Sequence, residues 1–103
     1  MIFRRPFADL IQRQLDLFAR DYADLIADTD AAERAYDRAD RAEAEERYGD
    51  LVDLVETATE QLAEVRDHFA STLDAESAES YCIAYNRAVL KRWHPFAREI
   101  ENR

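Results

Sequence analysis

The sequence predicts an all-α protein: a three-helix elongated bundle with one long central helix and a coiled-coil-like seam. Its 103 residues include one glycine and two prolines, too few for the frequent turns of a β-sandwich or barrel. A chain of this length is expected to form one domain, residues 1–103. The central helix is indicated by apolar positions spaced alternately four and three residues apart, the repeat of a coiled-coil seam: Ala44, Tyr48, Leu51, Val55, Ala58, Leu62, Val65 and Phe69.

The first helix is predicted to begin at Pro6, because the fixed φ of proline suits the first position of a helix. It is expected to run to Ile26, after which Asp28, Thr29 and Asp30 carry side chains that compete with helical backbone hydrogen bonds. We therefore expect a tight turn over residues 28–30. The apolar residues of this helix recur at helical spacing and form a wide stripe: Phe7, Leu10, Ile11, Leu15, Phe18, Tyr22, Leu25 and Ile26.

The central helix is expected to begin at Asp30, which forms a capping-box pattern with Glu33, and to end at Phe69. About 40 residues at ~1.5 Å each make a rod of about 60 Å. Neither flanking helix is long enough to cover such a rod. The seam therefore predicts a homodimer in which a second copy supplies the missing cover. Gly49 leaves two alternatives open, a bent rod and a rod that breaks.

The last helix is predicted to follow a turn at residues 71–74, with Asp74 as its N-cap. Pro95 removes a backbone hydrogen bond and interrupts the helical pattern. Phe96 and Ile100 nevertheless keep the phase of the stripe, so we expect a kink or a restart. The stripe contains Ala78, Cys82, Tyr85, Val89, Trp93, Phe96 and Ile100.

The charge of the chain is strongly negative and unevenly distributed. The formal net charge is −9, from 23 acidic and 14 basic side chains, which disfavours nucleic acid and membrane surfaces as partners. Residues 31–80 carry a net charge of −10, whereas residues 81–103 carry +3. These opposite charges can attract each other within one chain or between two.

The cysteine count and the apolar runs indicate a cytoplasmic protein. Cys82 is the one cysteine, so no internal disulfide can form, and a reducing compartment is expected. The first residues lack the apolar core of a secretory signal. No apolar run approaches the ~20 residues that span a bilayer.

Two carboxylate pairs are the candidates for metal binding: Glu43 with Glu46, and Glu64 with Asp67. Their spacing resembles the metal-binding pattern of the all-α nucleotide pyrophosphatases. The resemblance covers four residues and implies a Mg²⁺-dependent hydrolase in which the two pairs face each other from separate helices. One continuous helix would hold the pairs about 27–30 Å apart. His68 shares a helical face with Glu64 and is a further metal candidate.

The sequence favours a small interaction or scaffold protein that acts through protein–protein contacts as a homodimer. A regulatory role is one form that this function can take. We assign no catalytic residues and expect no cofactor. The partner-binding residues are predicted to lie on the seam and in the basic, aromatic C-terminal segment. For Trp93 and Phe96, burial in the core is the first expectation, a protein interface the second and nucleic-acid binding the third. A ligand-binding bundle lined by Tyr81, Tyr85 and Trp93 is a further alternative. The predicted partner-binding residues are Tyr48, Leu51, Val55, Leu62, Val65, Phe69, Trp93 and Phe96.

Overall fold

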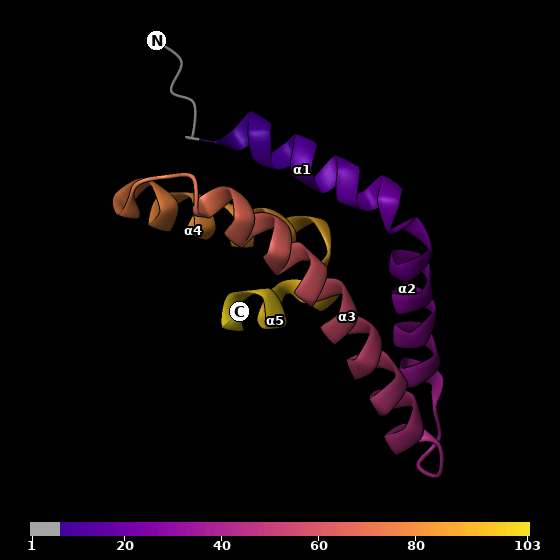
Figure 1. Ribbon diagram of the computed structural model, residues 1–103. Helices are drawn as coiled ribbons and strands as arrows, with labels where there is room; N and C mark the ends of the chain where they lie inside the picture. The colour runs from indigo at the N-terminus through magenta and orange to yellow at the C-terminus, as the bar shows by residue number, and fades with distance from the viewer. Residues whose placement is uncertain (1–6) are drawn as a thin grey trace.

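The computed structural model describes residues 7–103, and this part of the chain is helical without strands (Figure 1). The all-α prediction is therefore confirmed for these residues, but the prediction of three helices is wrong. The helices are α1 (Ala8–Asp21), α2 (Ala23–Arg38), α3 (Ala44–Ala70), α4 (Ala75–Arg92), the 3₁₀ helix η1 (His94–Phe96) and α5 (Ala97–Asn102). The predicted start at Pro6 lies outside the described residues.

The predicted turn at residues 28–30 does not form, because α2 continues through it. Thr29 is 1% exposed, and its hydroxyl donates a hydrogen bond to the Leu25 carbonyl at 2.8 Å. Through this bond the threonine hydroxyl is satisfied within the helix, so it does not disrupt the helical backbone hydrogen bonds. The break comes earlier, at Tyr22, whose φ of −118° separates α1 from α2. The predicted capping box at Asp30 is likewise wrong, since Asp30 lies inside α2.

The turn between α2 and α3 lies at residues 39–43. Ala39 leaves the helical conformation, with φ −67° and ψ 140°. The Asp40 carboxylate then accepts a hydrogen bond from the Glu43 backbone N–H at 3.0 Å, which satisfies one of the donors left free at the start of a helix. The chain therefore reverses here, and α2 packs antiparallel to the N-terminal half of α3 (Figure 1).

Helix α3 is continuous through Gly49, so of the two alternatives that the sequence left open at this glycine, a bend or a break, the break does not occur. Its 27 residues correspond to about 40 Å at ~1.5 Å per residue, shorter than the predicted rod of about 60 Å. The molecule measures 54 × 26 × 23 Å, and its radius of gyration of 15.6 Å exceeds the ~13 Å typical of a compact chain of this length. The expectation of an elongated shape is thus met.

The C-terminal half of α3 lies in a compact body with α1, α4, η1 and α5. As the sequence predicts, Asp74 caps α4 by accepting a hydrogen bond from the Ser77 backbone N–H at 2.8 Å. The chain restarts after Trp93, with Pro95 inside η1, and this returns α5 to the body. The fully buried apolar residues are Ile11, Leu15, Phe18, Ala58, Leu62, Ala63, Tyr81, Tyr85, Val89, Phe96 and Ile100.

Residues 30–56, the ends of α2 and α3 with the turn between them, project from this body and are called the arm here (Figure 1). The arm contains no fully buried side chain. Its two helices pack on each other, and its half-buried residues include Ala32 and Ala35 of α2 and Leu51 and Val55 of α3. Alanines let the two helix backbones approach closely, which is the condition under which a strip of small residues holds a partner helix.

Substitution of Gly49 tests the continuity of α3. A Cβ added at Gly49 meets no heavy atom within 4 Å, and a glycine inside a helix costs about 0.5–1 kcal/mol relative to alanine. We expect Gly49→Ala to raise the free energy of unfolding by this amount in urea titrations followed by circular dichroism. Gly49→Pro should lower it by about 3 kcal/mol. A stabilising proline at this position would show that the helix is interrupted there.

Candidate protein-interaction surfaces

The predicted partner-binding residues of the seam are mostly covered within one chain. Leu62 is fully buried, and Val55, Val65 and Phe69 pack against the core. Leu51 is half-buried on the arm. Only Tyr48, at 54% exposure, presents a large surface to solvent. The stripe therefore does not need a second copy to cover it, because α2 and the helices of the body supply the cover.

The aromatic residues predicted near the C-terminus also lie in the body. Phe96 is fully buried, and Trp93 packs on Phe18 and Phe96, with ring centroids 5.4 and 6.2 Å away. Tyr81 and Tyr85, which were expected to line a ligand pocket with Trp93, are fully buried with their rings in contact at 5.8 Å. These rings are packed within the core.

The five metal candidates do not converge. Glu43 and Glu46 lie at the start of α3, whereas Glu64, Asp67 and His68 lie near its end. About 18 residues of one continuous helix separate the two carboxylate pairs, which corresponds to about 27 Å. No group of three or more His, Cys, Asp and Glu side chains in residues 7–103 could hold a metal ion. The arrangement that the pyrophosphatase resemblance implies, two pairs facing each other, is absent from this part of the chain.

A buried arginine that was not among the predicted site residues joins three helices. Arg66 of α3 is 4% exposed. Its Nη1 donates hydrogen bonds to the Asn86 side-chain oxygen of α4 at 3.0 Å and to the Ile100 carbonyl of α5 at 2.9 Å. Its Nε contacts the exposed Asp67 carboxylate at 2.8 Å. Because the Ile100 carbonyl lies in the last turn of α5, the guanidinium also faces the negative end of that helix dipole.

The position of Arg66 in the sequence does carry a signal. It lies four residues after Leu62 and three before Phe69, so it falls on the same helical face as the apolar stripe. A charge on such a face is expected to be paired when it is buried. Its partners, however, lie 20 and 34 residues further along the chain, and nothing in the local pattern points to them.

Two core tyrosines are also fixed through their hydroxyls. The Tyr85 hydroxyl donates to the Leu62 carbonyl, and that of Tyr81 donates to the Gln14 side-chain oxygen, both at 2.8 Å. Burial raises the pKa of Tyr81 to about 12 and raises that of Tyr85 further. Burial also raises the pKa of the Cys82 thiol, which disfavours the reactive thiolate. These groups serve packing rather than proton transfer.

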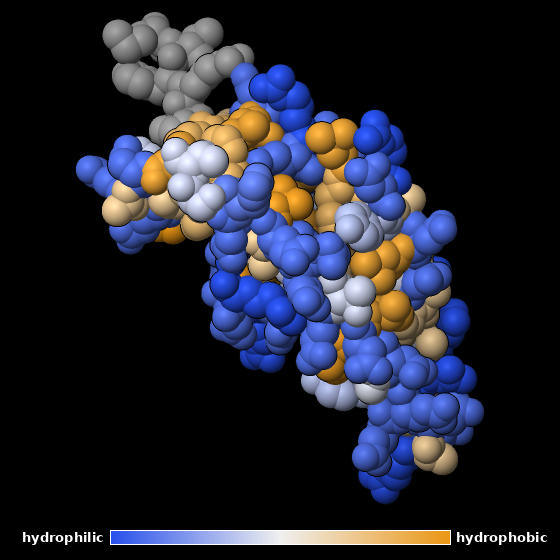
Figure 2. All heavy atoms as spheres, viewed as in Figure 1, coloured by the Kyte–Doolittle hydropathy of each residue, from blue (hydrophilic) through white to orange (hydrophobic). Residues whose placement is uncertain are grey.

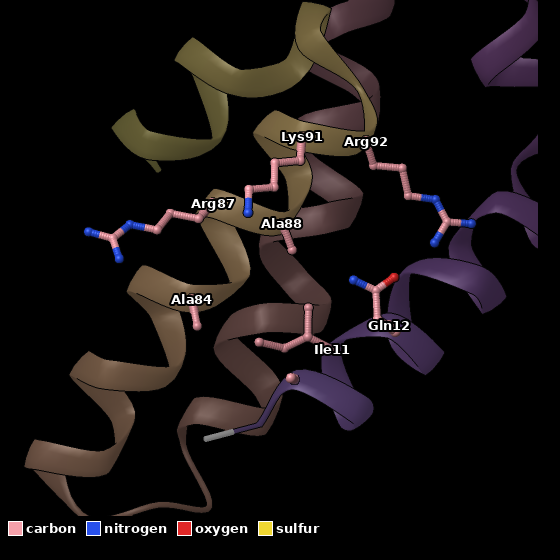
Figure 3. Close-up of a pocket in the computed structure, with 8 residues that line it drawn as sticks. Ile11, Gln12, Ala84, Arg87, Ala88, Lys91 and Arg92 are labelled. Carbon is pink, nitrogen blue, oxygen red and sulfur yellow. The ribbon is translucent and has the colours of Figure 1, made fainter. Parts of the chain in front are cut away.

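A groove lies between α1 and α4 on the body (Figure 3). It encloses about 470 Å³, within the range of ligand and peptide sites. The floor is apolar and made of small residues with Ile11, and cationic side chains of α4 form one edge. In Figure 3, Arg92 reaches toward the α1 side while Arg87 extends away from it. The lining residues are Ala8, Ile11, Gln12, Ala84, Arg87, Ala88, Lys91 and Arg92.

The arm carries a different surface. Tyr36 of α2 and Tyr48 of α3 contact each other with ring centroids 5.4 Å apart, and the two residues are 38% and 54% exposed. The surrounding surface is strongly acidic, because residues 30–56 contain 10 acidic and 4 basic side chains. Figure 2 shows hydrophilic residues covering most of the end of the arm on the face in view.

The chain was compared with models of protein families, with curated proteins and with solved structures, and none of the three comparisons finds a match. None of the helices formed by residues 7–103 combines the length and apolar character needed to cross a bilayer.

Replacing Arg66 tests whether it holds α5 on the body. Arg66→Met keeps much of the side-chain volume but leaves the Asn86 oxygen and the Ile100 carbonyl without their donor. Leaving buried acceptors unsatisfied costs about 1–3 kcal/mol, so we expect the free energy of unfolding to fall by this amount in urea titrations. Arg98→Met, at an exposed position of α5, should change it by less than about 0.5 kcal/mol. A variant at position 66 as stable as the parent would contradict this role.

Proposed function

We propose that this chain is a small helical interaction protein that acts as a scaffold through protein–protein contacts and forms a homodimer. The observation that supports this proposal is the exposed contact between Tyr36 and Tyr48 on the arm. Tyrosine is enriched among the residues that dominate binding energy at protein interfaces. Two rings in contact at a projecting end of the molecule are accessible to a partner from several directions.

The construction of the arm favours binding by these rings. Each tyrosine comes from a different helix, and the rings contact each other in the free chain. A surface that is ordered before association loses less conformational entropy on binding, so more of its contact energy appears as affinity. The arm thus presents the pair on two packed helices rather than on a loop.

The proposed dimer contact is not the α3 seam that the sequence predicted. The α3 stripe is packed within one chain, so it cannot be the main contact between two copies without unfolding the arm. The exposed aromatic pair is available without such a change. A stable interface buries about 1,200–2,000 Å² in total, so the tyrosines would form the centre of a larger contact.

We assign the chain no catalytic role, and we propose a cytoplasmic location. The carboxylates that would have to bind Mg²⁺ are spread along α3, and no specific observation favours a hydrolase or a ligand-binding bundle over an interaction protein. The single thiol of Cys82, partly buried and without a partner cysteine, suits a reducing compartment.

The oligomeric state and the role of the tyrosines can be tested together. Light scattering behind size exclusion should give a mass near 24 kDa, twice the 12.0 kDa of one chain. The double variant Tyr36→Ser with Tyr48→Ser should weaken the dimer at least about tenfold, because interface hot spots contribute about 2 kcal/mol or more. Leu17→Ser, which removes a similarly exposed apolar side chain from α1, is the matched control.

A mass of one chain at every concentration up to the millimolar range would refute the homodimer. A dimer that both variants leave equally strong would instead refute the role of the tyrosine pair. Circular dichroism should show unchanged helix content in each variant.

A further inference from the structure

The groove between α1 and α4 has the form of a receptor for an apolar side chain. Ala84 and Ala88 of α4 lie one helical turn apart and, with Ala8 and Ile11 of α1, leave an open floor that larger residues would fill. The resulting space of about 470 Å³ is large enough for one or two aromatic rings. The floor therefore favours an apolar occupant.

The edge of the groove favours an acidic occupant. Arg87 and Lys91 line it, and neither has a hydrogen-bond or ion-pair partner among residues 7–103. Arg92, the third cation, is bound to Asp16 across the groove at 2.7 Å. Residues 81–98 contain no acidic side chain, so on this acidic protein the groove is a local region of positive charge. Complementary charge selects the partner and its orientation.

The arm carries the two features that complement the groove, exposed aromatic rings and negative charge. It has exposed aromatic rings at Tyr36 and Tyr48, and residues 30–56 carry a net charge of −6. Glu33 and Glu45 each lie three residues before one of these tyrosines, so each carboxylate shares a helical face with its ring. An aromatic pair flanked by carboxylates matches an apolar floor flanked by cations.

We propose that the groove of one copy receives the arm of a second copy, with the tyrosine rings on the alanine floor and the carboxylates beside Arg87 and Lys91. This inference rests on the proposed homodimer and names its two surfaces. The arm and the groove lie in opposite halves of a molecule 54 Å long (Figure 1). Two copies side by side in opposite directions therefore make the same contact twice, which closes the assembly with two-fold symmetry.

The net charge of −9 on each copy opposes association over long distances. At 0.15 M salt the Debye length is about 8 Å, so most of this repulsion is screened while charges in direct contact still attract. The experiment is accordingly carried out at this ionic strength.

Charge reversal tests both surfaces by analytical ultracentrifugation. Arg87→Glu with Lys91→Glu is expected to raise the dimer dissociation constant at least about tenfold, and so is Glu33→Lys with Glu45→Lys, because each pair puts like charges in contact. The chain that carries all four substitutions should regain a dissociation constant within about threefold of the parent. Arg98→Glu with Arg103→Glu changes the net charge as much as the groove variant, at exposed positions of the C-terminal segment, and should leave the dimer intact.

The outcomes separate this inference from the proposed function. A parent chain that sediments as one copy refutes the homodimer and the groove contact together. A dimer that neither pair of reversals weakens keeps the homodimer but refutes the groove as its site. Failure of the fourfold variant to recover, with helix content preserved, refutes the pairing of these particular charges. A mass that grows beyond two copies would show an open chain of contacts and refute the two-fold arrangement.

Discussion

The apolar stripe of α3 is covered from Leu51 to Phe69, and different helices cover its two halves. Near the N-terminal end, α2 lies along it, whereas α4, η1 and α5 contact the C-terminal end. A single helix of this length cannot be enclosed by one short neighbour, because the flanking helices contain 14 to 18 residues against the 27 of α3. This division of the cover produces a compact body with a projecting arm.

The two halves differ in how tightly they are held. The body contains nearly all of the fully buried side chains, together with the hydrogen bonds of Arg66 and Tyr85 that join α3 to α4 and α5. The arm has one helix pair and no fully buried apolar residue. Segments with few buried contacts open more readily than the rest of a fold. The arm is therefore both the more exposed and the less stable part of the fold.

Several elements could be predicted from local patterns, because their causes are local. The Asp74 cap depends on a backbone N–H three residues away, and the restart at Pro95 follows from the missing donor of proline. The chain reversal at residues 39–43 was missed because Ala39 is a good helix former, while Thr29 resembles a helix breaker but bonds to Leu25 within α2. The groove and the Arg66 contacts depend on residues far apart in sequence, so periodicity alone could not reveal them.

Amide hydrogen exchange tests most directly whether one chain covers its own stripe. The measurement is made at a concentration where light scattering gives a single copy, and it follows the α3 amides from Leu51 to Val55, beneath α2. If α2 covers this part of the stripe, these amides should exchange at least about 100-fold more slowly than in an unfolded chain. Exchange at the unfolded rate in the single copy, with protection restored only when a second copy binds, would contradict intrachain cover.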